Sequence, residues 1–103
     1  MGMIYTVPVK NIAARLNGDN IPAIVKPIEG GAAVVVNLEN GERVSAICSP
    51  NSWGGSSGRL EICGGVTESE GIISDVFGGL TEEDVYNRFK YCYENNTRVY
   101  HKD

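Results

Sequence analysis

The sequence AAVVVNLENGERVSAICS, residues 32–49, predicts a β-hairpin. Two segments with alternating apolar residues, 32–38 and 43–49, flank Asn40-Gly41, a pair that suits the positive φ angles of a two-residue hairpin turn. Because side chains alternate between the two faces of a strand, one apolar face can be assigned. It would consist of Val34, Val36, Leu38, Val44, Ala46 and Cys48.

Further strands are predicted on both sides of the hairpin. Residues 21–28 read as an edge strand, because Pro22 and Pro27 lack the N–H that a central strand needs. Residues 59–64 read as a strand that turns Cys63 away from the core, so no disulfide to Cys48 is expected. Residues 97–100 are extended in character and would add a last edge strand or reach across to another subunit.

One helix is predicted to begin after Thr81, whose hydroxyl can cap it. Acidic residues 82–84 suit the positive end of the helix dipole, and Val85, Phe89 and Cys92 form an apolar stripe of helical period. Residues 12–16 predict no more than a short helical turn. Chain 1–103 is therefore expected to be a single α+β domain: a small antiparallel sheet, a meander of about four to five strands, packed by one carboxyl-terminal α-helix.

Composition narrows the classes of function. No apolar run approaches the ~20 residues that a membrane span needs, and no signal peptide is evident, so a cytoplasmic protein with reduced cysteines is expected. The net charge is −4, and the segment 60–87 alone carries seven acidic residues and no basic one. This charge argues against a nucleic-acid polymer as partner and leaves two interpretations of the segment, a solvated acidic face or a docking surface.

Catalytic chemistry finds little support in the sequence. The single histidine, His101, is the third residue from the end of the given chain, and the three cysteines have no base partner at a recognisable spacing. No metal-binding loop is recognisable among the carboxylates. We therefore expect a protein that is not an enzyme and that needs no cofactor or metal.

Two glycine-rich loops are the candidate binding elements. Residues 49–58 place Trp53 among serines and glycines, where its ring either stacks on a ligand or folds back on the core. Phe77 precedes two glycines at the start of the predicted helix. Arg59, Arg88 or Arg98 would have to neutralise any phosphate bound there.

Residues 52–55, 58–61 and 77–85 resemble the first type of Thoeris anti-defence protein, a family of phage proteins. The resemblance implies a small sheet with a helical carboxyl-terminal part, assembled into dimers or higher homo-oligomers. It also implies binding, without cleavage, of cyclic ADP-ribose isomers or related cyclic nucleotides. In such a site Phe77 would stack on a base and Asn87 would hydrogen-bond its edge.

Two hypotheses follow. In the first, the protein sequesters a cyclic nucleotide or cyclic ADP-ribose-type immune signal: Trp53 or Phe77 stacks, Asn87 hydrogen-bonds, and Arg59 or Arg98 meets the phosphate. In the second, the acidic segment binds a host defence protein, such as a CRISPR-like nucleic-acid-binding protein, and blocks its basic groove. Neither hypothesis involves a membrane.

Overall fold

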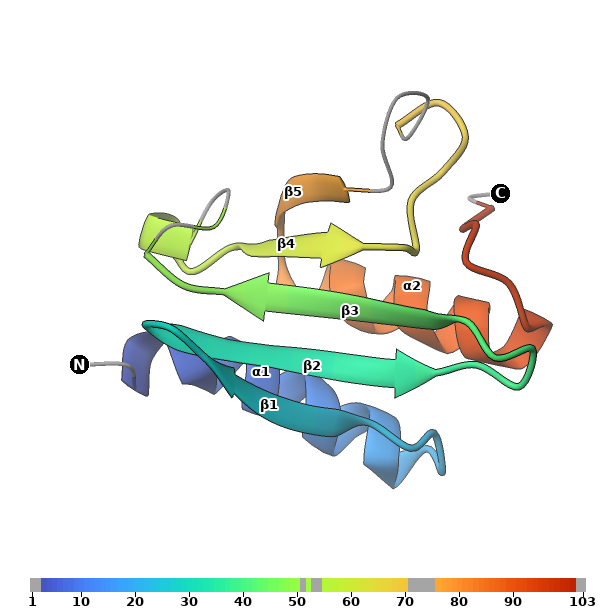
Figure 1. The fold of residues 1–103 in the computed structure, drawn as a ribbon, viewed down its shortest axis with the longest axis horizontal. Coiled ribbons are helices and arrows are strands. Elements are labelled where there is room, and N and C mark those ends of the chain that lie inside the picture. The colour runs from blue at the N-terminus through green and yellow to red at the C-terminus, as the bar shows by residue number, and fades with distance from the viewer. Residues whose placement is uncertain (1–2, 51, 53–54, 71–75, 102–103) are drawn as a thin grey trace.

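A computed structural model describes residues 3–50, 52, 55–70 and 76–101. Figure 1 shows the arrangement of the elements within these residues. In chain order they are α1 (Met3–Gly18), β1 (Ile24–Ile28), β2 (Gly31–Asn37), β3 (Arg43–Cys48), the short 3-10 helix η1 (Gly55–Ser57), β4 (Leu60–Cys63), β5 (Val76–Leu80) and α2 (Glu82–Asn95).

The five strands form one antiparallel meander in the order β1-β2-β3-β4-β5, which confirms the predicted α+β class and places β1 at an edge. The hairpin β2–β3 has the predicted register, with Val34 opposite Ala46 and Val36 opposite Val44. The next pair along, Ala32 and Cys48, lies on the same face. All the apolar residues predicted for that face are buried in the core.

The turn of this hairpin is longer than predicted. The last strand pair is Asn37 with Arg43, and Leu38 N–H donates to the Glu42 carbonyl over 2.8 Å. Within the turn only Gly41 has a positive φ, of 90°. The Asn40 backbone N–H and side chain bind Asn96, at 2.8 and 3.1 Å, so this turn is held against the end of α2.

The fifth strand is not the one that the sequence suggested. It is β5, which leads directly into α2, whereas residues 97–100 make only one isolated bridge, between Val99 and Val66. Two glycines in β5 lower its intrinsic strand propensity, so the residue pattern did not predict this strand. Pairing with β4, through Ile62 opposite Phe77, compensates for this.

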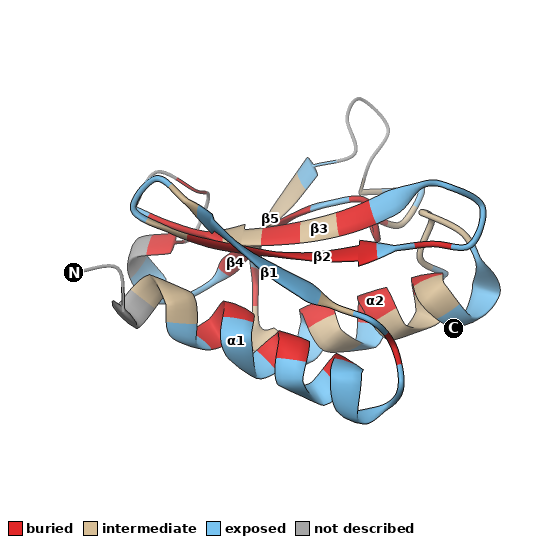
Figure 2. Cartoon of the chain, turned by 60° about the horizontal axis from the view of Figure 1, so that its bottom comes forward, coloured by how far each residue is buried: buried red, intermediate tan, exposed pale blue. Residues whose placement is uncertain are grey.

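The expectation of a single helix is wrong, because α1 covers the sheet together with α2. Figure 2 shows both helices on the same side of the sheet. Pro8 and several β-branched residues give this segment a low intrinsic helix propensity. It is helical because Val9, Ile12 and Leu16, spaced three and four residues apart, are fully buried against the strands.

The second helix begins as predicted, directly after Thr81. The Thr81 hydroxyl accepts from Asp84 N–H at 3.1 Å, and the Asp84 carboxylate accepts from Thr81 N–H at 3.2 Å. This reciprocal pair is a capping box. Asn96 closes the helix in the left-handed conformation, with φ 53°.

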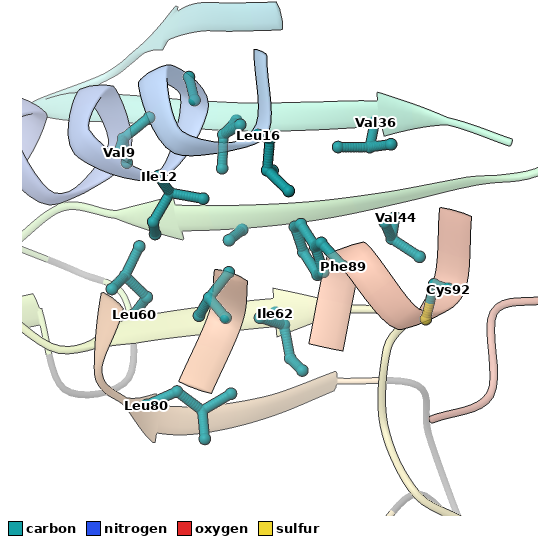
Figure 3. Packing of buried hydrophobic residues seen from close by; sticks show 14 of the residues in the cluster. Val9, Ile12, Leu16, Val36, Val44, Leu60, Ile62, Leu80, Phe89 and Cys92 are labelled. Atoms are coloured by element: carbon teal, nitrogen blue, oxygen red, sulfur yellow. The ribbon is translucent and has the colours of Figure 1, made fainter. Parts of the chain in front are cut away.

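The core lies between the sheet and the two helices. Figure 3 shows the side chain of Phe89, from α2, among core side chains from both halves of the chain. Leu16 and Ile12 come from α1, and Leu60 and Ile62 from β4; all are at most 1% exposed. Neither helix in the described part of the chain has both the length and the apolarity to cross a bilayer.

Candidate functional site

Among the described residues, Arg88 is the one buried charged residue. It projects from α2 and is only 7% exposed. Its two terminal nitrogens donate to the two carboxylate oxygens of Glu70 over 2.7 and 3.0 Å. One of them also donates to the Gly65 carbonyl at 3.1 Å. This fork fixes the segment that follows β4 to the second helix.

Glu70 closes a tight turn, residues 67–70. Its carboxylate accepts from Thr67 N–H at 3.1 Å, and its own N–H donates to the Thr67 carbonyl at 3.0 Å. The hydrogen bonds from Arg88 lower the pKa of Glu70 to about 2, against an ordinary value of 4.5. Glu70 is therefore a carboxylate at physiological pH and neutralises Arg88.

The carboxyl-terminal segment lies alongside this turn. Gly65 N–H donates to the Arg98 carbonyl over 2.7 Å, and Tyr100 N–H donates to the Val66 carbonyl over 3.1 Å. The phenol ring of Tyr100 is held on two sides. The guanidinium carbon of Arg88 lies 5.0 Å from its centroid, and Tyr91 packs edge-on at 5.5 Å.

An open hollow of about 510 Å³ lies between the turn and this segment. It is lined by Thr67, Glu68, Ser69, Glu70, Tyr100 and His101. Its volume falls within the usual range for small-ligand sites, roughly 300–1,000 Å³. The lining is mainly polar and supplies acceptor oxygens together with aromatic rings, so it suits N–H donors better than phosphate oxygens.

The comparisons give no family. No family model, curated protein or solved structure matches the chain. The resemblance to the Thoeris anti-defence family therefore stays a prediction, and the site has to be judged on its own geometry.

The two arginines predicted to meet a phosphate, Arg59 and Arg98, do not come together. Arg59 is exposed and donates to the Gly79 carbonyl at 3.3 Å, near the end of the β4–β5 pair where Leu60 faces Leu80. Arg98 lies at the other end of β4, where it donates to the Arg43 carbonyl and to the Cys63 sulfur. The two guanidinium groups therefore lie at opposite ends of β4 and cannot bind the same phosphate.

Phe77 and Asn87, two further predicted site residues, are also apart from the hollow's lining. Phe77 is half-buried and packs against the core, with the Arg88 guanidinium carbon 5.6 Å from its centroid. Asn87 is exposed on α2 and donates to Glu83 at 3.4 Å. Trp53 lies outside the described residues.

The acidic segment 60–87 is largely engaged within the chain. Glu70 binds Arg88, Glu83 binds Arg15 at 2.6 Å, Glu82 accepts from Asn11 at 3.2 Å, and Asp84 caps α2. Asp75 lies outside the described residues. Most of these carboxylates therefore have a structural role, and Glu68, exposed at the rim of the hollow, is the one best placed to meet a ligand.

The described cysteines and potential metal ligands are further candidates for a reactive site. Cys48 is fully buried and its sulfur faces the Arg59 carbonyl at 3.6 Å; burial raises the pKa of this thiol, which keeps it protonated. Across the described residues, no group of three or more potential ligands is arranged to hold a metal ion.

Glu68, Ser69 and Tyr100 were missed as site residues by the sequence analysis. Their proximity depends on the Arg88–Glu70 ion pair and on the bridge of Val66 with Val99, which join segments about 20 to 30 residues apart. No local sequence motif predicts such a contact. The single early signal was that Arg88 is the first basic residue after the acidic segment.

Proposed function

We propose that this protein is a non-catalytic binding protein that holds a nucleotide in the hollow between residues 67–70 and 100–101. The observation that carries the proposal is the lining: Glu68 and Ser69, which bear a carboxylate and a hydroxyl, line the same space as the aromatic residue Tyr100. Proteins recognise unstacked bases with this combination, an aromatic ring against the base and polar groups on its edge.

The charge of the site decides which part of the nucleotide enters. Two glutamates line the hollow, while Arg88 is neutralised by Glu70, so a phosphate would meet net negative charge there. A base edge that carries N–H groups would instead find an acceptor in Glu68. Guanine presents two adjacent donors and adenine one amino group, so guanine nucleotides should bind more tightly.

The residues that surround the hollow are held in place by contacts within the chain, which favours binding over catalysis. The ring of Tyr100 is held by Arg88 and Tyr91, and the 67–70 turn is held by its own hydrogen bonds. Little side-chain entropy would therefore be lost on binding. Sequestration requires only such affinity, and it agrees with the cyclic nucleotide signal that the resemblance implies.

Calorimetric titration with GMP, AMP, UMP and their cyclic forms tests this proposal. We expect a purine nucleotide to bind, and Glu68→Gln to weaken binding by roughly ten-fold because an amide offers one acceptor where a carboxylate offers two. Glu94→Gln, an exposed change on α2, is the matched control and should bind like the wild type. Equal binding by all three proteins would refute the assignment of the site.

The second hypothesis, an acidic inhibitor of a host defence protein, is less well supported. Four of the carboxylates on which it depends, Glu70, Glu82, Glu83 and Asp84, are bound within the chain. A partner's basic groove would have to compete with these contacts.

A further inference from the structure

The lining of the hollow contains two acidic residues that differ in their partners. They are Glu68 and Glu70, and the described residues that line the hollow include no lysine or arginine. Glu70 is paired with Arg88 through both of its carboxylate oxygens, at 2.7 and 3.0 Å. The hydrogen bonds within the 67–70 turn are made by its other residues, and Glu68 takes part in none of them. Its carboxylate is therefore available to a ligand.

Arg88 does not offset the charge of Glu68. Its side chain is 9% exposed and is not among the residues that line the hollow, and Glu70 balances its charge. The pair is formally neutral, so the charge that remains at the wall is that of Glu68. Within the described lining, only His101 can carry a positive charge. The two residues after His101 have opposite charges and lie outside the described residues.

A purine that is itself positively charged fits these charges best. Guanine becomes a cation when the nitrogen at its 7-position carries an alkyl group, and it keeps the ring N–H and the amino group that a carboxylate accepts. Opposite charges a few ångströms apart attract each other even at an open surface, although water and salt weaken the attraction. A charged guanine therefore gains an interaction with Glu68 that a neutral guanine lacks.

Tyr100 favours the same kind of ligand. An aromatic ring attracts a cation placed against its face, so a charged base stacks more strongly on it than a neutral one. The guanidinium carbon of Arg88 already lies 5.0 Å from the centroid of this ring, and an unpaired guanidinium would repel a second cation. Glu70 removes most of that repulsion by balancing the charge of Arg88.

We infer that the hollow preferentially binds guanine that carries a positive charge on its base, of the kind produced by alkylation at the 7-position. The inference rests on the proposed function, because it names the form of the base that this same site prefers. Glu68 accepts from the edge of the base and balances its charge, and Tyr100 stacks on the base. The phosphate of such a nucleotide lies on the solvent side, away from the two glutamates of the lining.

Calorimetric titration with three nucleosides tests the inference, because nucleosides lack the charge of a phosphate. Guanosine is neutral, and 7-methylguanosine adds a methyl group and a positive charge. The third ligand, 7-methyl-7-deazaguanosine, has the methyl group at the same place without the charge. We expect 7-methylguanosine to bind roughly ten-fold more tightly than its uncharged isostere. Added salt should reduce this ratio, since it screens charges at an open site.

Three variants assign the preference to Glu68. Glu68→Gln should remove it, so that the two methylated nucleosides bind with equal affinity. Glu29→Gln is the matched control, because it removes the same charge from the exposed turn between β1 and β2, at the other end of the strand order. It should keep the preference, and so should His101→Gln, which removes the one positive charge that the described lining can carry. Circular dichroism of each variant separates lost binding from lost folding.

The results distinguish a failure of this inference from a failure of the proposed function. Equal affinity of the wild type for the two methylated nucleosides would overturn the inference alone, because guanine would still bind in the hollow. A preference that persists in Glu68→Gln would also overturn it, since another group would then recognise the charge. If none of the three nucleosides bound to the folded wild type, the inference and the proposed function would both be wrong.

Discussion

Arg88 and Glu70, eighteen residues apart, are joined by two hydrogen bonds of 2.7 and 3.0 Å. This pair ties α2 to the turn that forms one wall of the hollow, and the same guanidinium packs against Tyr100 in the other wall. One side chain therefore fixes both walls, so the integrity of the hollow can be tested through it.

Replacing Arg88 with Met should destabilise the protein by about 2–4 kcal/mol, because it leaves the Glu70 carboxylate unpaired in a largely buried site. Urea unfolding followed by circular dichroism measures this change. Arg15→Met is the matched control. It breaks the Arg15–Glu83 pair, whose side chains are 45% and 63% exposed, so the loss should be much smaller. Similar losses for the two variants would contradict a special role for Arg88.

Acid should remove the contribution of this pair. Because the pKa of Glu70 is about 2 in the folded protein and its ordinary value is 4.5, the unfolded chain takes up the proton first as pH falls. The stabilisation is fully present above about pH 5 and is lost toward pH 2. Glu70→Gln should therefore be less stable than the wild type at pH 6, with the gap narrowing by pH 3. A gap independent of pH would contradict the ion pair.

Leu16→Ala tests whether α1 belongs to the domain core. Leu16 is fully buried, and truncation of such a leucine costs roughly 2–5 kcal/mol. Lys10→Ala, at an exposed position of the same helix, should change the free energy of unfolding by less than about 0.5 kcal/mol. If Leu16→Ala and Lys10→Ala had the same free energy of unfolding, the result would contradict the packing of α1 on the sheet.

Gly31→Ala should be strongly destabilising for a steric reason. A Cβ atom at Gly31 would lie 2.0 Å from the carbonyl oxygen of Cys48, which is backbone and cannot rotate away. Gly18→Ala, where nothing lies within 4 Å of the new atom, is the control and should be nearly neutral or stabilising. Thermal unfolding of the two variants checks the close approach of β2 and β3 at this point.

The parts of the fold that follow from local patterns were predicted from the sequence. Alternation in residues 32–49 gave the hairpin and its core face, and the cap at Thr81 gave the start of α2. The α1 helix was not predicted, because Pro8 and its β-branched residues disguise a segment that tertiary packing makes helical. Strand β5 was missed because Gly78-Gly79 indicates a loop when pairing with β4 is unknown.

The candidate site was less predictable than the fold. Arg59, Asn87 and Arg98 were chosen for their chemistry, but each binds a different part of the chain. Glu68 and Tyr100 meet only because the carboxyl-terminal segment crosses beside the 67–70 turn. A contact of this kind depends on long-range register, which residue types and spacing do not encode locally.

Native mass spectrometry with the nucleotide panel tests the central claim, binding without turnover, most directly. The protein would be incubated with GMP, AMP and their cyclic forms, and the ligand would be released and weighed afterwards. We predict a complex whose mass exceeds that of the free protein by one intact nucleotide, lost in Glu68→Gln and kept in Glu94→Gln. Release of a cleaved nucleotide, or no complex with any member of the panel, would contradict the account.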